Sequence, residues 1–215
     1  MTKVATAKKR RSDKVDHLRQ DAALNRERLL AAAEQVFASQ GTSASLEDVA
    51  RAAKVGPATL YRRFASKDAL VREVLTSFFS RLIELARQAE AAPPEKCIEL
   101  FLETVGWELA DKAGFTHTLW GELSPWALID ELAELADQLL RRAQQSGAIH
   151  ASVTHDDIAA AVWALRGVVQ ASRTADNEIE REAWRRHLAF VLAGFRVGVG
   201  ATPAAGRNAK RKQRK

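Results

Sequence analysis

The segment from Val55 to Leu70 reads VGPATLYRRFASKDAL, and its side chains are of the kinds that contact nucleic acid. If a helix begins at Pro57, then Leu60 and Phe64 lie one turn apart and face inward. The positions that then point outward, wholly or in part, are Ala58, Thr59, Tyr61, Arg62 and Arg63. The chemistry expected of such a surface is hydrogen bonding to base edges and phosphates.

Each outward side chain suits one kind of contact with DNA. Thr59 can hydrogen-bond a base or pack its methyl group on thymine, whereas Ala58 can make only the methyl contact. Arg62 can reach a guanine edge or a phosphate. Phosphate contacts are expected from the side chains of Tyr61, Arg63 and Lys67. They are also expected from the N-terminus of the helix, which follows Gly56 and begins at Pro57, because it offers free backbone N–H groups to an anion.

Three predicted helices must hold this surface in place. Apolar residues at helical spacing predict a helix over Asn25–Ser39, with Gly41 as its stop signal. The sequence Ser45-Leu-Glu-Asp48 has the form of a capping box and predicts a short helix to about Ala53. The proline in the first position predicts the third helix, over Pro57–Phe64. Ser45 and Lys54 flank the second helix, and we expect both to contact DNA as well.

The rest of the chain also predicts helices, with no alternating Val, Ile and Thr pattern that would indicate a strand. Ser66-Lys-Asp68 begins a long helix that reaches about Ala91 before Pro93-Pro94 ends it. The later predicted helices are Pro94–Lys112, Gly114–Leu123, Pro125–Gln145, Thr154–Arg173 and Asn177–Val199. The expected fold is therefore all-α, with about nine helices.

Bulk composition limits the class of protein. The 215 residues are 47% hydrophobic, enough for a sizeable core, and the single cysteine, Cys97, excludes an internal disulfide framework. No apolar run is long enough for a membrane span, and the basic N-terminus has no apolar stretch of a secretory signal after it. We therefore expect a cytoplasmic protein without a membrane partner.

The positive charge is concentrated at the two ends of the chain. Seven basic and two acidic residues give residues 1–20 a charge of +5, and six basic residues give residues 201–215 a charge of +6. The total of +6 then leaves −5 for the residues between them. We expect both tails to be disordered, and they could either bind nucleic acid without specificity or simply remain solvated.

Residues 25–72 resemble the DNA-binding head of the TetR family of transcriptional repressors. The family pattern runs roughly V-x-x-x-T-L-Y-x-x-F-x-S-K-x-x-L, and the matching residues are Val55, Thr59, Leu60, Tyr61, Phe64, Ser66, Lys67 and Leu70, with Ala32, Phe37, Val49 and Ala50 upstream. Two positions depart from it: Lys54 replaces the usual glycine, and Ala65 replaces a frequent proline. A positive φ at Lys54 would cost roughly 1 kcal/mol relative to glycine. A plain helical bundle with a basic stripe is the alternative.

The resemblance implies that different parts of the chain have different functions. Residues 21–70, the head, would bind double-stranded operator DNA, and residues 71–200, the body, would bind a small-molecule effector and form a homodimer. Residues 1–20 and 201–215 are the two tails. The residues of the body carry a charge of −6, which favours a neutral or cationic effector.

Candidate residues for the two tasks of the body come from its aromatic and small side chains. Effector-pocket candidates are Phe101, Trp107, Phe115, His117, Trp120, Trp126, Trp163, Arg166 and Gln170. Dimer-interface candidates, which allow close helix approach or cover a second apolar face, are Ala160, Ala164, Gly167, Ala171, Trp184, Phe190, Gly194 and Val197. Ordinary packing inside one subunit is the alternative for both sets.

The sequence contains no pattern typical of catalysis. There is no HExxH or CxxC spacing, no glycine-rich phosphate loop and no Gly-x-Ser-x-Gly turn. The run His155-Asp156-Asp157 is better explained as a helix start with acids at the positive end of the dipole. We therefore expect no enzyme activity, metal or cofactor. The main hypothesis is a ligand-released repressor, and the alternative is a non-specific architectural DNA-binding protein that uses its basic tails.

Overall fold

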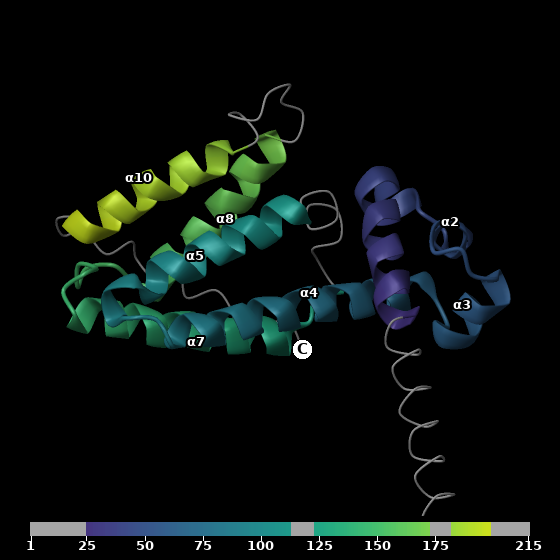
Figure 1. Cartoon of the computed structure of the whole chain (residues 1–215), viewed down its shortest axis with the longest axis horizontal. Helices are drawn as coiled ribbons and strands as arrows, with labels where there is room; N and C mark the ends of the chain where they lie inside the picture. Colours follow the sequence, from purple (N-terminus) through teal and green to yellow (C-terminus); the bar gives the residue numbers. More distant parts are fainter. Residues whose placement is uncertain (1–24, 113–122, 173–181, 199–215) are drawn as a thin grey trace, which may run out of the picture.

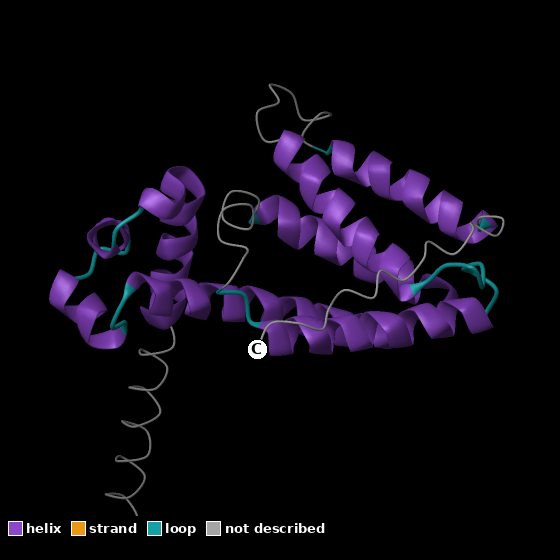
Figure 2. Ribbon diagram, turned by 180° about the vertical axis from the view of Figure 1, so that it is seen from behind, coloured by secondary structure: helices purple, strands orange, loops and turns teal. Residues whose placement is uncertain are grey.

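The computed structural model describes residues 25–112, 123–172 and 182–198, which contain helices and loops but no strand (Figure 2). The elements are a first helix of residues 25–40, a 3-10 turn η1 (Gly41–Ser43), α2 (Leu46–Ala52), α3 (Pro57–Arg63), α4 (Lys67–Glu90), α5 (Pro94–Asp111), α7 (Trp126–Gln145), α8 (His155–Ser172) and α10 (Ala183–Val197). The all-α prediction is confirmed. The predicted helix Gly114–Leu123, the start of the last helix and both tails lie outside the described residues.

Local signals determine the helices of the head. The Ser45 hydroxyl accepts from the Asp48 N–H while the Asp48 carboxylate accepts from the Ser45 N–H, so the predicted capping box is present. Pro57 occupies the first turn of α3, after Gly56 as its N-cap. Lys54, between α2 and α3, has a φ of 56°, which confirms the positive φ considered for this position.

Inside the head, the helices pack around the head's end of a hydrophobic core that continues into the body. Its buried members include Leu29, Phe37, Leu46, Val49, Leu60, Phe64 and Leu70. Leu60 is fully buried, and Phe64 is 5% exposed, as their one-turn spacing predicts. These two side chains hold α3 against the head and turn its other face outward.

Helix α4 connects the head to the body (Figure 1). The Ser66 hydroxyl accepts from the Ala69 N–H at its start, and its 24 residues correspond to a length of about 36 Å. At its far end, the guanidinium of Arg142 on α7 donates to the carbonyl oxygens of Glu90 and Ala92, at 2.6 and 3.2 Å. The far end of α4 is therefore fixed to the body through its otherwise unpaired carbonyls.

The body is built in layers, with α4 beside α7, then α5 and α8, then α10 (Figure 1). A close approach joins α5 to α10, because a Cβ atom at Gly106 would lie 2.1 Å from Cζ3 of Trp184. Trp184 is only 1% exposed. The prediction that Trp184 forms a dimer surface is therefore wrong: its ring fills the space above Gly106 inside the subunit.

Candidate functional site

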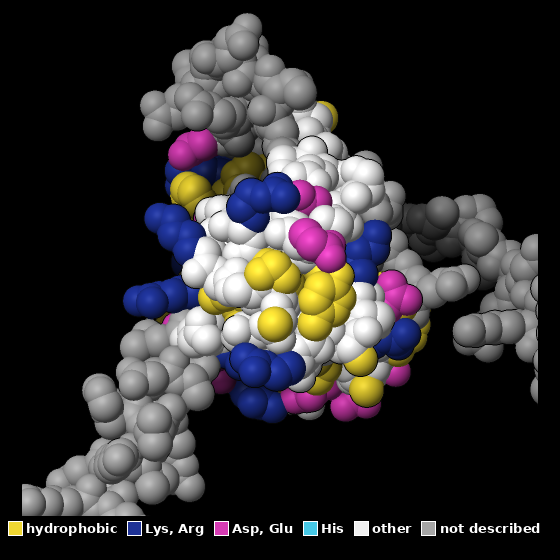
Figure 3. Space-filling model, turned by 90° about the vertical axis from the view of Figure 1, so that its right-hand side faces the viewer, with side chains coloured by type: hydrophobic (Ala, Val, Ile, Leu, Met, Phe, Trp, Pro, Cys, Tyr) yellow, Lys and Arg dark blue, Asp and Glu magenta, His cyan; other side chains and the backbone are white. Residues whose placement is uncertain are grey.

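The outward face of α3 lies at the end of the head farthest from the body (Figure 1). Ala58, Tyr61, Arg62 and Arg63 are exposed there, and Thr59 is half-buried. Figure 3 views this end of the molecule and shows Lys and Arg side chains around exposed apolar ones. The fold thus places the residues expected to contact DNA on one accessible surface, where Lys and Arg side chains stand among apolar and acidic ones.

Two of these side chains have partners on the surface of the head. Nη2 of Arg62 lies 3.4 Å from Oγ1 of Thr59, one turn earlier on α3. The guanidinium of Arg63 lies over the ring of Phe64, 5.8 Å from its centroid. Arg62 is therefore oriented along the outer face of α3, whereas Arg63 leans toward its end.

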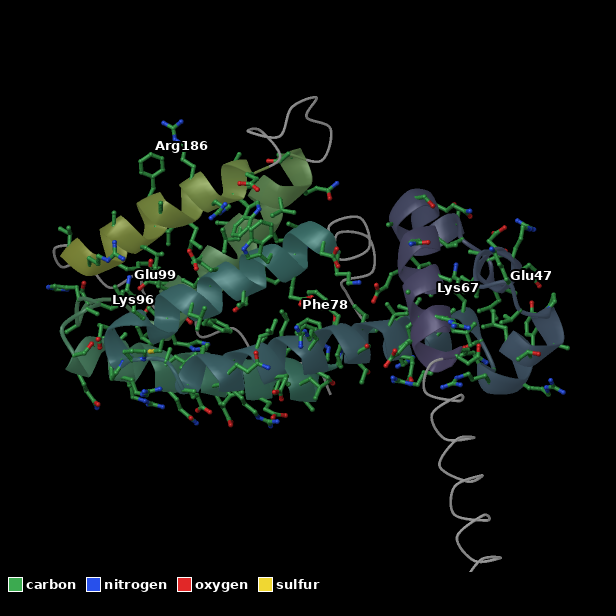
Figure 4. The ribbon with its side chains drawn as sticks, in the orientation of Figure 1. Glu47, Lys67, Phe78, Lys96, Glu99 and Arg186 are labelled. Carbon is green, nitrogen blue, oxygen red and sulfur yellow. The ribbon has the colours of Figure 1, made fainter. Side chains whose placement is uncertain are left out.

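Glu47 is a residue of this surface that the sequence did not single out. The phenol of Tyr61 donates a hydrogen bond to Oε1 of Glu47, which ties α3 to the first turn of α2. This hydrogen bond lowers the pKa of Glu47 and raises the pKa of Tyr61. Figure 4 shows Glu47 and Lys67 on the head. The only signal in the sequence was that Glu47 lies in the first turn of α2, inside the capping box; nothing indicated its hydrogen bond to Tyr61.

The other residues expected to contact DNA frame α3 at its two ends. The Ser45 hydroxyl is already occupied by the Asp48 N–H and carboxylate. Lys54 and Gly56 are exposed in the turn before α3, and Pro57 begins the helix. Lys67 is the half-buried first residue of α4. All of the predicted DNA-contact residues therefore lie in or beside the α2–α3 unit.

A cavity of about 140 Å³ lies in the body between α4, α5, α7 and α8. Its described lining is apolar apart from His155, and includes Phe79, Phe101, Leu109, Ile129, Val162 and two tryptophans, Trp126 and Trp163. Three of the nine predicted pocket residues, Phe101, Trp126 and Trp163, line this cavity. Phe115, His117 and Trp120 lie outside the described residues.

The other three predicted pocket residues do not line the cavity. Trp107 is 49% exposed and packs edge-to-face on Trp184, with 5.2 Å between the ring centroids. The guanidinium of Arg166 stacks over Trp163 at 5.3 Å, and burial lowers the pKa of Arg166. Gln170 has its Oε1 atom buried on α8. Helical periodicity could not separate these positions, since each is on the correct helix but on another face.

His155 lines the cavity although the sequence indicated only a helix start at this position. It is the first residue of α8, and its side chain is half-buried. The Thr154 hydroxyl and Asp157 carboxylate form the capping box around it, with Thr154 N donating to Oδ2 of Asp157 at 2.7 Å. His155 therefore supplies the one polar side chain of the described lining.

The outer faces of α8 and α10 expose small and apolar residues, with the guanidinium of Arg186 over the ring of Phe190. Ala160, Gly167 and Ala171 are exposed on α8, and Ala164 is half-buried. On α10, Phe190 is 65% and Val197 79% exposed, and Gly194 is exposed beside them. A Cβ atom at Gly167 or Gly194 would have no atom within 4 Å. Apart from Trp184, the predicted interface residues therefore lie at or near the surface of the subunit.

The described residues also lack two further classes of feature. No group of three or more His, Cys, Asp or Glu side chains that could hold a metal ion occurs within them. None of their helices has the length and apolarity needed to cross a bilayer.

The comparisons with known proteins agree with this geometry. Residues 29–74 match the family model for bacterial regulatory proteins of the tetR family, and residues 93–197 match the C-terminal domain of SbtR-like transcriptional regulators. The HTH-type transcriptional regulator UidR from Escherichia coli strain K12 is 28% identical over 109 residues, which is 50% of this chain and 51% of UidR. The chain thus spans about half the length of the curated relatives that it matches.

Solved structures extend the similarity over most of the chain. A TetR transcriptional regulator from Streptomyces coelicolor is 26% identical, with a TM-score of 0.59 over 79% of this chain and 97% of that one. The TetR regulatory protein from Mycobacterium vanbaalenii is 27% identical, with a TM-score of 0.61 over 83% and 98%. With family models covering both the head and the body, this chain belongs to the TetR family of DNA-binding transcriptional regulators, which are not enzymes.

Proposed function

We propose that the protein is a homodimeric repressor in the cytoplasm that binds a palindromic operator and is released by a small-molecule effector. The observation that carries the proposal is the combination of the exposed basic face of α3 with an apolar cavity in the body, linked by α4.

The DNA-reading part of the proposal assigns different tasks to neighbouring residues. Arg62 and Thr59 lie together on the outer face of α3, where side chains can reach base edges in the major groove. Arg63, Tyr61, Lys54 and Lys67 would contact phosphates and fix the register of the head, while Ala58 would contact a thymine methyl group. Gly56 and Pro57 would place the N-terminus of α3 against a phosphate, and Ser45, at the N-cap of α2, would face the DNA backbone beside it.

The homodimer part of the proposal rests on the outer faces of α8 and α10. Large exposed apolar side chains on a folded subunit often mark an interface. Pairing of Phe190, Gly194 and Val197 with the α8 stripe of a second copy would cover them. A two-fold dimer would then present two α3 helices to half-sites about 34 Å apart or at a similar groove spacing.

The cavity supports a small, uncharged effector. No acidic side chain occurs in its described lining, so a neutral ligand fits better than a cationic one. Apolar cavities of about 150 Å³ can hold a benzene molecule, and this cavity is of similar size. Phe101, Trp126 and Trp163 would contact such a ring, and His155 could hydrogen-bond a single polar substituent.

Release from DNA requires that the effector prefer the state that does not bind DNA. An occupant between α4, α5, α7 and α8 would displace α4, whose first turns belong to the head. The two heads would then leave the spacing of the grooves. The equilibrium shifts only as far as the difference in effector affinity between the two states allows.

In vitro selection of binding sites from random DNA tests the proposal most directly. The full chain should enrich one sequence with two inverted half-sites, and the Arg62→Ala variant should lose the preference at one base pair of each half. Enrichment of a single unsymmetrical half-site, or of no sequence, would contradict the homodimeric repressor.

A non-specific architectural DNA-binding protein remains the second candidate because of the charges of +5 and +6 on residues 1–20 and 201–215. It would lose nearly all DNA affinity when both tails are deleted, together with its salt dependence. The repressor should lose part of its affinity but still discriminate its operator from random DNA. Competition binding with both DNAs, for the full chain and the shortened one, separates the two functions.

A further inference from the structure

The last two turns of α5 contact both the cavity and the head. Val105 and Leu109, one turn apart, line the cavity. Lys112, the residue that ends α5, extends to the head, where its Nζ lies 2.6 Å from Oε2 of Glu34. Glu34 belongs to the helix of residues 25–40, and its neighbour Ala33 is fully buried in the hydrophobic core. The C-terminal end of α5 thus has the cavity on one side and the head on the other.

The ion pair between Lys112 and Glu34 is partly removed from solvent. The Lys112 side chain is 29% exposed and that of Glu34 is 15% exposed. Burial by itself lowers the pKa of Lys112, but the hydrogen bond and charge of Glu34, with the charge of Asp111, outweigh it and raise the pKa overall. The ammonium group is therefore held by its acidic partners, more firmly than in a fully exposed pair.

A second ion pair supports the same turn. Nε of Arg81 on α4 lies 3.2 Å from Oε1 of Glu108 on α5, and buried Phe78 lies on α4 at the same level. Figure 4 shows Phe78 near the middle of α4. Because a helical turn moves as a unit, a displacement of Leu109 is carried to Glu108 and Lys112.

We propose that Lys112 and Glu34 are positioning residues that transmit the filling of the cavity to the head, by a direct contact of α5 with the first helix that acts in addition to α4. This inference rests on the proposed function, since it takes the cavity as the effector site. Helix α4 is fixed at its far end by Arg142, whereas the Lys112–Glu34 pair acts on the first helix, whose buried residues share the hydrophobic core with Leu60 of α3.

A substitution that fills the cavity tests the route without knowledge of the effector. Ala133 on α7 is half-buried and lines the cavity, so Ala133→Phe places a ring in it. Operator affinity of the full chain should fall about tenfold, within the usual range of allosteric coupling. In the Lys112→Met background the same filling should reduce affinity less than about threefold, and Glu34→Gln should have the same effect as Lys112→Met.

Two controls separate coupling from a general loss of stability. Lys112→Arg keeps the charge and reach of the pair, and should restore the tenfold effect of filling. Arg87→Met breaks an ion pair of the same length, Arg87–Glu131 at 2.6 Å, which lies within the body and does not contact the head, and should leave the effect of filling unchanged. Thermal unfolding identifies any variant that does not fold, and Ala159→Leu on α8 then replaces Ala133→Phe.

The possible results distinguish this inference from the proposed function. If filling lowers affinity equally with and without Lys112, the route through α5 is wrong and the effector site stands. If both filling variants fold and neither changes affinity in any background, the cavity does not control the head, and both proposals are wrong.

Discussion

The head and the body use helices in different ways. The helices α2 and α3 of the head have seven residues each, and a capping box, a Gly-Pro start and a positive φ define their ends. The helices of the body have 15 to 24 residues and are joined through long apolar faces. Short helices are marginal by themselves, so their geometry depends on these terminal signals and on the head's end of the hydrophobic core.

This difference means that the head and the body differ in how easily they can change conformation. The head fixes one surface, because Leu60 and Phe64 anchor the inner side of α3 and leave its outer side to DNA. The body contains a half-open apolar cavity of about 140 Å³, whose lining includes the exposed Trp126 and Trp163. The body can change shape when a ligand fills its cavity. The surface of the head stays constant, because the ends of α2 and α3 are fixed by local capping.

The largest predicted effect lies in the body and separates two kinds of aromatic residue on α10. Trp184→Ala should lower the free energy of unfolding by about 3–5 kcal/mol, because it empties the space above Gly106. Phe190→Ala, which removes an exposed ring, should change the stability of the subunit by less than about 0.5 kcal/mol. Chemical denaturation of both variants at several protein concentrations measures these differences.

The dimer proposal adds a second readout to this pair. Phe190→Ala should raise the dissociation constant of the dimer, measured by analytical ultracentrifugation, whereas any change in assembly of Trp184→Ala should follow its unfolding. An unchanged dimer in Phe190→Ala would argue against the outer face of α10 as the interface.

The next effect concerns DNA and compares two neighbouring arginines of the head. Arg62→Ala should weaken operator binding by about 1–3 kcal/mol and relax the preference at one base pair, as expected for a base contact. Arg63→Ala should weaken binding to operator and random DNA alike and reduce the salt slope by about one. Titrations at several salt concentrations with both DNAs test the division, and equal behaviour of the two variants would contradict it.

These two comparisons indicate which features the sequence could predict. The head was predictable because its signals are local: Ser45, Pro57 and the spacing of Leu60 to Phe64 act within a few residues. Trp184 was misplaced because its partner, Gly106, is far away in the sequence, and periodicity cannot tell a face buried inside the subunit from one buried between subunits. His155 and Glu47 were missed as members of their sites for the same reason, since the residues they face are on other helices.

The capping boxes of α2 and α8 allow the head and the body to be compared by removing one equivalent hydrogen bond from each. Ser45→Ala and Thr154→Ala remove the same kind of cap from α2 in the head and from α8 in the body. Each should cost about 1 kcal/mol of stability, but only Ser45→Ala should reduce operator affinity, because α2 supports α3 directly. Thermal unfolding and operator titration of both variants provide the comparison.

The Ser45–Asp48 capping box makes the stability of the head depend on pH. Hydrogen bonds from Ser45 lower the pKa of Asp48, so this stabilisation is present above the ordinary pKa of an aspartate and is lost as the pH falls through the lowered value. Ser45→Ala should therefore reduce the acid sensitivity of the head. A variant that loses stability on acidification as steeply as the native chain would show that the box does not contribute to it.

The smallest effect comes from the backbone of the head. Lys54 has a φ of 56°, a conformation that glycine adopts without the steric cost of a Cβ atom. Lys54→Gly should therefore raise the free energy of unfolding by about 0.5–1 kcal/mol, after allowance for the greater freedom of glycine in the unfolded chain. If Lys54 contacts a phosphate as proposed, the same substitution should weaken DNA binding and reduce its salt slope by about one. If the variant is more stable but binds DNA more weakly, Lys54 lowers the stability of the turn and at the same time contributes a DNA contact. If it is more stable and binds DNA equally well, Lys54 is not part of the DNA interface.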